Sequence, residues 1–394
     1  MTHADSPTVL AERRQHLGVL TLNRPKALNA LSLEMIRLVT TQLLAWRDDP
    51  QIGAVLLRGA NREGKAPAFC AGGDIRYFHE AALAGDPTLE DFFSEEYALN
   101  HLIHTFGKPT FALMDGVTMG GGMGLAQGCS MRVVTEHAKL AMPETNIGLF
   151  PDVGGGWFLA RTPGYLGEFL GLSGQVLGAA DALAVDWADI CVSADRLDDL
   201  VQAIVDATAV DGVGALSAVN AFAADAGASP LAAQRDLIDR VFAAHDLAAI
   251  VAALAAEEGE FAGALAKTLS QRSPLMMAVT LEQIRRARTM TLADDLRMER
   301  GLVRHCFHLR PGAASETLEG IRALVVDKDH APRWNPSAIA DVSPAMVAAY
   351  FASPWPAHAH PLRDLARPAS SNVHLGASGT AVIGGEPGAR SRSE

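Results

Sequence analysis

The sequence has few cysteines, few aromatic residues and no excess of positive charge. Its four cysteines, Cys70, Cys129, Cys191 and Cys306, lie far apart and form no CxxC pair. A secreted domain stabilised by disulfides is therefore not expected. We expect the cysteines to be reduced thiols. The formal net charge is -12, which argues against a general nucleic-acid binder, because such proteins carry a basic face that displaces counterions from the phosphate backbone.

Long apolar runs are also absent. No stretch reaches about 18 uninterrupted apolar residues, the length that a membrane-spanning helix needs. Residues 1–15 carry charges and no apolar run, so a secretory signal is not expected there. Together with the sparse cysteines, these absences predict a cytoplasmic protein without a membrane span.

Several catalytic and metal-binding signatures are missing. No G-x-S-x-G occurs, so the serine nucleophile of an α/β-hydrolase lacks its turn. No HExxH occurs, and the pairs His101/His104 and His305/His308 have no paired carboxylate, so no metal site is predicted. Residues 59–66 (GANREGKA) come close to a phosphate-binding loop, but alanine replaces the Ser or Thr that would bind magnesium.

Strand and helix patterns alternate in the first half of the chain. An apolar strand is predicted at residues 18–22, a helix with apolar residues at helical spacing at 33–44, and a strand at 52–59. Ser32 is the expected N-cap of that helix. Further strands are predicted at residues 111–114, 131–134 and 139–142. This alternation predicts an α/β fold.

The second half is predicted to be mainly helical. Residues 179–265 are rich in alanine and keep helical spacing of their larger apolar residues. Beyond Trp355 the composition shifts to Pro, Ala, Gly, Ser and His without a sustained period, which is typical of a flexible tail. We therefore expect a core with the active site at 1–195, a mainly helical region at 196–345 and a flexible tail at 346–394.

Two glycine-rich clusters follow predicted strands, at residues 68–75 (AFCAGGDI) and 115–124 (DGVTMGGGMG). Glycine leaves backbone N–H groups free to point into a site. One such cluster is more often an ordinary tight turn. Two clusters can supply the two converging donors that stabilise negative charge at a reacting carbonyl, where losing one donor costs on the order of 3 kcal/mol.

Two carboxylates lie in turns flanked by apolar residues and glycine. Glu144 follows Pro143, and Asp152 follows Pro151. Such surroundings can raise the pKa of a carboxyl group towards the range needed for acid/base chemistry. In isolation the structural alternatives are favoured, with Glu144 capping a helix start and Asp152 forming an Asx turn.

In this order, the segments resemble the crotonase, or enoyl-CoA hydratase/isomerase, superfamily. Residues 22–31 (LNRPKALNAL) and the two glycine clusters are similar to its signatures. The resemblance implies a crotonase-like α/β fold, a spiral of ββα units followed by a helical C-terminal region. It also implies that the backbone N–H groups of Gly73 and Gly121 form an oxyanion hole.

The resemblance further implies an acyl-CoA substrate, with no metal and no cofactor besides the CoA that the substrate itself carries. It implies neither a nucleic-acid partner nor a membrane partner, and it leaves open whether the chain forms a homo-oligomer. The residues that it places at the CoA moiety are Lys26, Ala27, Leu28, Ala71, Asp74 and Ile75.

Later segments resemble one branch of the superfamily, the 3-hydroxyisobutyryl-CoA hydrolases, and the resemblance extends from about residue 8 to about residue 335. The segments that carry it are residues 95–97 (EEY), 141–161 (AMPETNIGLFPDVGGGWFLAR), 273–274 (SP) and 319–334 (EGIRALVVDKDHAPRW). Hydratases of the superfamily use two glutamates, and Gly124 stands at the position of the first. Asp152 stands where hydratases usually have glycine.

The resemblance therefore implies hydrolysis of a small 3-hydroxyacyl-CoA thioester. The expected substrate is 3-hydroxyisobutyryl-CoA, which would give 3-hydroxyisobutyrate and CoA in valine catabolism. Glu144 would act at the thioester carbonyl, either as a general base for water or as a nucleophile. Asp152 and Glu96 would contact the substrate around its acyl hydroxyl group. An enoyl-CoA hydratase or isomerase, and a non-catalytic acyl-CoA-binding relative, are the alternatives.

Overall fold

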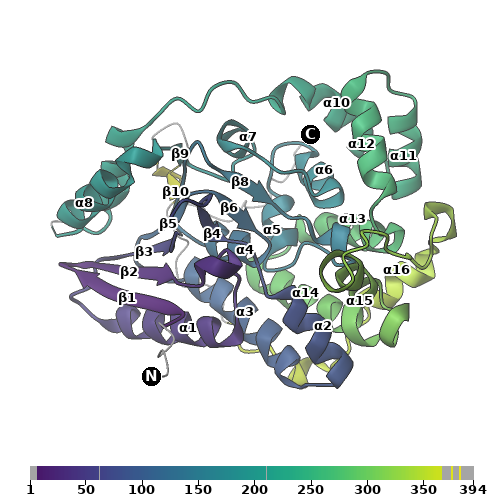
Figure 1. Cartoon of the computed structure of the whole chain (residues 1–394), viewed down its shortest axis with the longest axis horizontal. Coiled ribbons are helices and arrows are strands. Elements are labelled where there is room, and N and C mark those ends of the chain that lie inside the picture. Colours follow the sequence, from purple (N-terminus) through teal and green to yellow (C-terminus); the bar gives the residue numbers. More distant parts are fainter. Residues whose placement is uncertain (1–6, 62, 210, 366–373, 376–380, 383–394) are drawn as a thin grey trace, which may run out of the picture.

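A six-stranded sheet with the strand order β1-β2-β3-β5-β7-β9 forms one side of the computed structural model (Figure 1). The structure describes residues 7–61, 63–209, 211–365, 374–375 and 381–382. The strands are β1 (Val9–Arg14), β2 (Leu17–Leu22), β3 (Ala54–Gly59), β5 (Thr110–Met114), β7 (Met131–Val134) and β9 (Ile190–Cys191). β1 is antiparallel to β2, and the other neighbours are parallel. β2 is buried at every position, as expected for a parallel strand covered on both faces.

A second, parallel sheet has the order β4-β6-β8. Its strands are β4 (Ala68–Cys70), β6 (Val117–Met119) and β8 (Lys139–Ala141). Each of them follows a strand of the large sheet along the chain and precedes one or more helical segments, so a strand, strand, helix order occurs three times. This repetition confirms the predicted spiral of ββα units. Because neighbouring parallel strands end at the same edge, the loops after β4, β6 and β8 are brought together.

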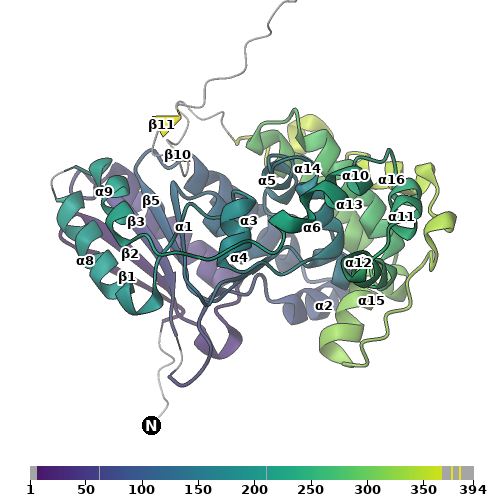
Figure 2. The ribbon, with the colours of Figure 1, turned by 90° about the horizontal axis from the view of Figure 1, so that it is seen from above.

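Helices cover both faces of the large sheet. One face packs against helices that include α1 (Leu33–Asp48), α3 (Thr88–His104) and α4 (Gly121–Gln127). The other face packs against α8 (Leu197–Thr208) and α9 (Gly214–Ala218), which lie at the outer edge of the molecule (Figure 2). The side chain of Ser32 accepts a hydrogen bond from the N–H of Met35, which confirms the predicted N-cap of α1.

The chain after β8 is mainly helical, and its later helices gather at the end of the molecule opposite β1 (Figure 1). Other helices are α2 (Ile75–Ala84), α5 (Gly155–Leu159), α6 (Leu166–Ser173), α11 (Leu247–Ala255), α13 (Pro274–Ala287), α14 (Leu292–His308), α15 (Glu316–Ile321) and α16 (Pro344–Phe351). The remaining helices are α7 (Ala179–Ala184), α10 (Arg235–Phe242) and α12 (Glu260–Ser270). Two short helical turns also matter, η2 (Glu144–Ile147) and the π-helical η7 (Arg322–Val326). The predicted helical C-terminal region is confirmed.

Part of the segment predicted as a flexible tail, residues 346–394, is packed. Tyr350 in α16 and Leu362 are both buried, so the packed body continues to residue 365 instead of ending at 345. A short antiparallel pair joins β10 (His374–Leu375) and β11 (Ala381–Val382). The other residues after 365 lie outside the described part of the chain. Among the described residues, no helix has both the length and the apolar character needed to cross a membrane.

Candidate active site

The loops that follow β4, β6 and β8 line one cavity of about 130 Å³. They contribute to it Ala71, Gly72 and Gly73, then Gly120 and Gly121, and finally Pro143 and Glu144. α3 adds Glu96, and the loop before α5 adds Asp152. The five residues predicted to carry the chemistry therefore line the same cavity, although they come from distant parts of the sequence.

The backbone N–H groups of Gly73 and Gly121 are available to a ligand in this cavity. Gly73 pairs with Leu31 in a parallel bridge, but its neighbours make the bonds: Leu31 N–H donates to Gly72 O at 2.8 Å, and Asp74 N–H donates to Leu31 O at 3.1 Å. The N–H of Gly73 therefore points away from Leu31. Gly121 opens α4, where an N–H has no intrahelical acceptor. A Cβ built on Gly121 would lie 3.5 Å from Gly73 N, so the two donors are neighbours.

Three buried carboxyl groups line the same cavity as these donors. Glu96 is 2% exposed, and Glu144 and Asp152 are each 6% exposed. Asp152 Oδ2 accepts a hydrogen bond of 2.7 Å from the hydroxyl of Tyr97. Within the described part of the chain, Glu96 Oε1 and Glu144 Oε2 have no hydrogen-bond partner. Burying polar atoms without partners is costly, and such an arrangement is characteristic of functional sites.

Burial raises the pKa of all three carboxyl groups, and repulsion between neighbouring charges adds to the rise for Glu96 and Glu144. Burial raises the pKa of Glu96 most, followed by the charges of Asp152 and Glu144. The pKa of Glu144 is raised by burial and by the charge of Asp152. Burial raises the pKa of Asp152 to about 6, against the opposing effect of the Tyr97 hydrogen bond. The cluster therefore exchanges protons closer to neutral pH than ordinary carboxyl groups do, which suits acid/base chemistry.

Two glycines make room around these carboxyl groups. Gly120 has a φ of 49°, and a Cβ there would lie 2.8 Å from Glu144 Oε1. A Cβ at Gly124 would lie 2.6 Å from the Cβ of Val153. Val153 therefore occupies the space in which a side chain at position 124 would begin, so the first glutamate of a two-glutamate hydratase has no room in this structure.

The residues predicted to bind CoA fall into two groups. Ala71 and Ile75 line the cavity. Lys26, Ala27 and Leu28 lie in an exposed turn, where η1 (Pro25–Ala27) ends. The carbonyl of Leu28 accepts a hydrogen bond of 3.0 Å from Ala71 N–H, so this turn lies beside the cavity wall. The placement suits contacts with the outer part of a CoA ester.

Asp74 differs from the other predicted CoA contacts. Its side chain accepts a hydrogen bond from Tyr77 N–H at the start of α2 and pairs with Arg24 at 3.2 Å. Arg24 also donates to the carbonyl of Ala30. The carboxylate of Asp74 thus links the first glycine cluster to the exposed turn, and its partners in the structure are protein groups.

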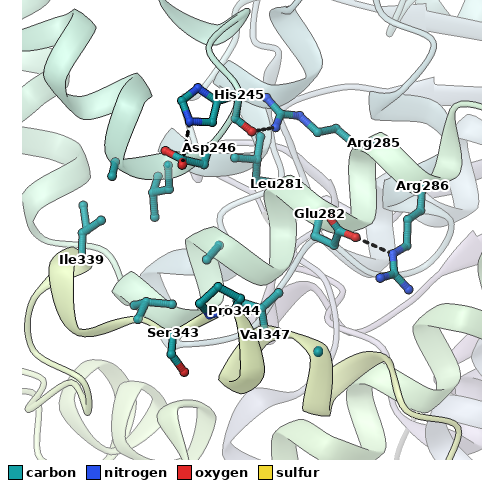
Figure 3. A pocket seen from close by; sticks show the side chains of 15 residues that line it. His245, Asp246, Leu281, Glu282, Arg285, Arg286, Ile339, Ser343, Pro344 and Val347 are labelled. Atoms are coloured by element: carbon teal, nitrogen blue, oxygen red, sulfur yellow. Dashed lines mark hydrogen bonds and ion pairs between the residues drawn. The ribbon is translucent and has the colours of Figure 1, made fainter.

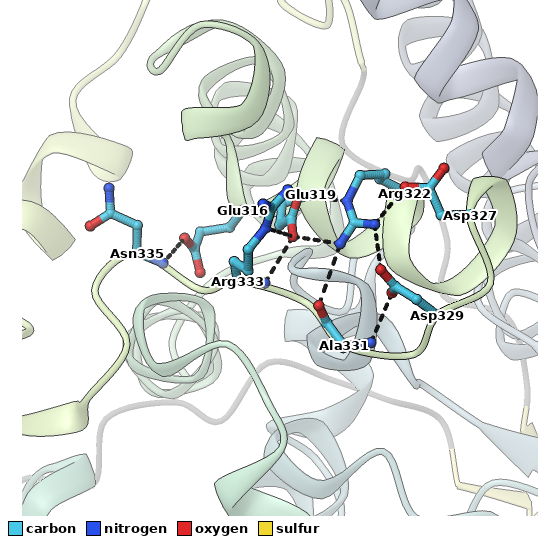
Figure 4. Close-up of polar contacts among 8 residues, drawn as sticks. All are labelled: Glu316, Glu319, Arg322, Asp327, Asp329, Ala331, Arg333 and Asn335. Atoms are coloured by element: carbon cyan, nitrogen blue, oxygen red, sulfur yellow. Dashed lines mark hydrogen bonds and ion pairs between the residues drawn. The ribbon is translucent and has the colours of Figure 1, made fainter.

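The helical C-terminal region closes the cavity. Leu324 in η7 lines it, and the turn is held by Arg322, which forms ion pairs with Glu319, Asp327 and Asp329 (Figure 4). Glu319 is buried, whereas both aspartates are more exposed. The motif at residues 319–334 therefore positions a wall of the cavity through ion pairs.

Tyr97 and two carboxylates of α14 lie near the site but were not predicted as site residues from the sequence. Tyr97 was predicted only as part of a motif, although it directly follows Glu96. Asp295 and Glu299 in α14 are fully buried and contact the loop around Asp152. Their spacing of four residues places them on one helix face, but this spacing alone gives no sign that the face is buried against a distant loop.

A larger cavity of about 360 Å³ lies between α11, α13 and α16 (Figure 3). Its charged side chains already have protein partners: Asp246 lies 3.0 Å from His245, Glu282 lies 2.7 Å from Arg286, and Arg285 donates to the carbonyl of His245. Of these contacts, only the bond from Arg285 to His245 joins two separate elements, and the lining residues offer no pair of donors comparable to Gly73 and Gly121. In the ranges that the structure describes, no group of three or more His, Cys, Asp or Glu side chains is placed to hold a metal ion.

Comparison with protein families and curated proteins gives consistent matches. The model of the enoyl-CoA hydratase/isomerase family matches residues 17–351. A protein named mitochondrial 3-hydroxyisobutyryl-CoA hydrolase from Xenopus tropicalis is 40% identical over 341 residues, which cover 85% of this chain and 86% of the relative. The protein of the same name from Homo sapiens is 37% identical over 357 residues, which cover 89% of this chain and 90% of the relative.

Two solved structures are similar over most of their length. One, described as a carnitinyl-CoA dehydratase from Mycobacterium thermoresistibile, has a TM-score of 0.81 and 39% identity, and the match covers 89% of this chain and 98% of that chain. The other, described as an enoyl-CoA hydratase from Rhodobacter sphaeroides 2.4.1, has a TM-score of 0.78 and 36% identity, with coverage of 88% and 98%.

Proposed function

Because this chain belongs to the enoyl-CoA hydratase/isomerase family, we propose that it hydrolyses a small 3-hydroxyacyl-CoA thioester, with 3-hydroxyisobutyryl-CoA as its substrate. The products are 3-hydroxyisobutyrate and CoA. The observation that carries the proposal is that Glu144 and Asp152 line one cavity while Val153 fills the space at Gly124. The names of the curated relatives from Xenopus tropicalis and Homo sapiens support it.

The reaction begins at the thioester carbonyl. Its oxygen accepts hydrogen bonds from the N–H groups of Gly73 and Gly121, whose bonding geometry leaves them available. Negative charge develops on this oxygen when the carbonyl carbon is attacked, so both bonds strengthen in the transition state. The donors are fixed by the bridge between Gly73 and Leu31 and by the start of α4, and they need little reorganisation during the reaction.

Glu144 supplies the attack by one of two routes. As a general base, its carboxylate takes a proton from water, the oxygen of that water bonds to the carbonyl carbon, and the carbon–sulfur bond breaks. The proton then passes to the departing CoA sulfur. As a nucleophile, the carboxylate bonds to the carbonyl carbon and expels CoA, and water hydrolyses the resulting anhydride. Both routes use the buried carboxylate beside the two donors and give the same products.

Asp152 and Glu96 orient the acyl group. A 3-hydroxyl group can donate to or accept from a buried carboxyl according to its protonation state. Asp152 is fixed by Tyr97 at 2.7 Å, and Glu96 Oε1 has no protein partner in the described chain. A substrate hydroxyl between them would satisfy the unpaired oxygen and hold the thioester near the two donors, which is an orientation effect.

A hydratase is the second candidate, because the two similar solved structures are described as a dehydratase and a hydratase. The packing of Val153 on Gly124 argues against a two-glutamate mechanism. Incubating the purified protein with 3-hydroxyisobutyryl-CoA and with crotonyl-CoA separates the candidates, with a thiol reagent following CoA release. Hydration of crotonyl-CoA without CoA release would refute the proposal. Binding of both esters without any turnover would identify a non-catalytic relative.

We also propose a cytoplasmic location and an acyl-CoA as the sole non-protein partner. The four cysteines are free and buried, which is compatible with a reducing compartment. The relatives from Xenopus tropicalis and Homo sapiens are named as mitochondrial proteins. Cell fractionation decides between the two compartments, and light scattering of the purified protein measures whether it forms a homo-oligomer.

A further inference from the structure

The turn that follows Asp152 is strained. Val153 has a φ of 58°, in the left-handed region that a β-branched residue rarely adopts, and Gly154 follows with a φ of 85°. A conformation of this kind is unfavourable and persists only where surrounding groups enforce it. The direction of the Asp152 carboxyl group therefore depends on contacts that hold the turn from outside.

Glu299 makes the main contacts with this turn. One oxygen of its carboxyl group accepts a hydrogen bond of 2.7 Å from Gly154 N–H, and the other accepts one of 2.9 Å from Gly156 N–H. The side chain is 0% exposed and reaches the turn from α14. A single residue thus fixes two N–H groups of the turn from an element about 145 residues away in the sequence.

Gln283 and Asp295 extend the same support. Gln283 Nε2 donates to the carbonyl of Pro151 at 2.7 Å and to Glu299 at 3.0 Å. Asp295 Oδ2 accepts a hydrogen bond of 2.9 Å from Trp157 N–H. These side chains therefore hold the backbone on both sides of Asp152. They bind it one residue before Asp152 and two, four and five residues after it.

The buried carboxyl groups of Glu299 and Asp295 lower the stability of the fold. Burial raises the pKa of both Glu299 and Asp295, that of Asp295 to about 7, and the charge of Asp295 further raises the pKa of Glu299. Two neighbouring buried carboxyl groups weaken a fold compared with well-packed apolar residues. Their cost is explained if the geometry of the turn matters for the reaction.

We propose that Glu299 is a positioning residue that, with Gln283, directs the Asp152 carboxyl group towards the acyl hydroxyl and thereby sets the preference for 3-hydroxyacyl-CoA over unsubstituted acyl-CoA. The inference rests on the proposed hydrolase function. Glu299 lines no part of the cavity and acts through the backbone of the turn. Loss of Glu299 should therefore alter the preference between acyl groups, whereas the N–H groups of Gly73 and Gly121 should keep their positions.

The test compares kcat/KM for 3-hydroxyisobutyryl-CoA and isobutyryl-CoA in the full-length protein and in Glu299→Gln. The amide retains the shape of the side chain but replaces one acceptor by a donor, so one of the two turn contacts is lost. We expect the ratio of the two kcat/KM values to fall at least about tenfold. Glu168→Gln is the matched control, because Glu168 is equally buried in α6 and pairs with Arg288 away from the cavity. Its ratio should stay unchanged even if its melting temperature falls.

If Glu299→Gln folds and its ratio of the two kcat/KM values equals that of the protein without the substitution, the inference is overturned. If that variant does not fold, Gln283→Met decides, because it removes the bonds to Pro151 and to Glu299 while keeping the Glu299 carboxyl group. An unchanged ratio in this variant overturns the inference equally. In Asp152→Ala, adding Glu299→Gln should lower the ratio no further, since both changes act through one carboxyl group. Failure of the unsubstituted protein to cleave either ester would instead refute the proposed function and, with it, this inference.

Discussion

The hydroxyl of Tyr97 donates a 2.7 Å hydrogen bond to Asp152 Oδ2, and both side chains are buried. The bond lowers the pKa of Asp152, whereas burial raises it to about 6. Tyr97 therefore influences how much of Asp152 is ionised near neutral pH. It also limits the rotation of a carboxyl group that we propose contacts the substrate.

Replacing Tyr97 by phenylalanine removes this donor while keeping the ring. We expect the pKa of Asp152 to rise further, so the pH dependence of kcat/KM for 3-hydroxyisobutyryl-CoA should move to higher pH. Loss of a buried hydrogen bond should lower the free energy of unfolding by about 1–2 kcal/mol. Steady-state kinetics across pH and urea denaturation measure the two effects. A pH profile identical to that of the unsubstituted protein would contradict the assignment.

Replacing Glu144 by glutamine removes the base or nucleophile with little change in shape. We expect turnover to fall by about 10²–10⁴-fold, because both routes need an ionisable carboxylate. Calorimetry should show that binding of the CoA ester persists. Glu95→Gln is the control, since Glu95 pairs with Arg37 on the surface and should have near-normal turnover. Undiminished turnover in Glu144→Gln would remove this residue from the mechanism.

Asp152 makes stability depend on pH. Its pKa rises from 3.8 to about 6 on folding, so the folded state retains the proton that the unfolded chain loses first. The free energy of unfolding therefore falls as pH rises through this window, by up to about 3 kcal/mol. Asp152→Asn should reduce this slope and should be the more stable protein above pH 6. Urea denaturation at several pH values checks the prediction, and equal slopes for the two proteins would refute it.

The ion pairs of Arg322 hold η7, which places Leu324 in the cavity wall. Arg322→Met keeps the aliphatic stem but removes the charge, and it leaves the buried carboxylate of Glu319 without its main partner. We expect KM for the CoA ester to rise severalfold with a smaller change in kcat, together with a lower melting temperature. Arg240→Met, which removes a surface ion pair with Glu257, provides the comparison. A selective loss of kcat would argue against a role in shaping the wall.

Much of the fold could be predicted from the sequence because its signals are local. Buried apolar runs marked β2 and β3, and Ser32 marked the start of α1. β1 was not predicted, because it is an edge strand with a single buried position, Val9, and it lacks the alternation that a half-buried strand shows. The helix pattern after residue 179 was correct in type but gave no information on which helices meet.

The candidate site was predictable only in part. Gly73, Gly121 and Glu144 follow strands, so their meeting at one edge follows from a repeated fold. The support that Glu299 gives to the Asp152 turn depends on two elements about 145 residues apart, and no local pattern reports such a contact. The strain at Val153 is likewise invisible in a sequence, since a β-branched residue argues against a left-handed conformation.

The close contact between positions 124 and 153 predicts intolerance to side chains at Gly124. Gly124→Ala should destabilise the protein by about 1–3 kcal/mol, because its Cβ would lie 2.6 Å from that of Val153. Val153→Gly alone should be tolerated better than its lost packing suggests, since glycine relieves the left-handed strain. Thermal denaturation of both single variants and of the double variant checks this. Additive losses in the double variant would show that the two positions do not compete for space.

This contact also imposes an order on any evolutionary route between one-glutamate and two-glutamate chemistry. A glutamate cannot enter at position 124 until residue 153 has been shortened, and Val153 lines the cavity together with Asp152, so shortening it also changes the cavity wall. An intermediate along that route would therefore have an altered acyl site before it gained a second glutamate. The steric conflict between positions 124 and 153 would thus prevent a single substitution from converting one-glutamate chemistry into two-glutamate chemistry.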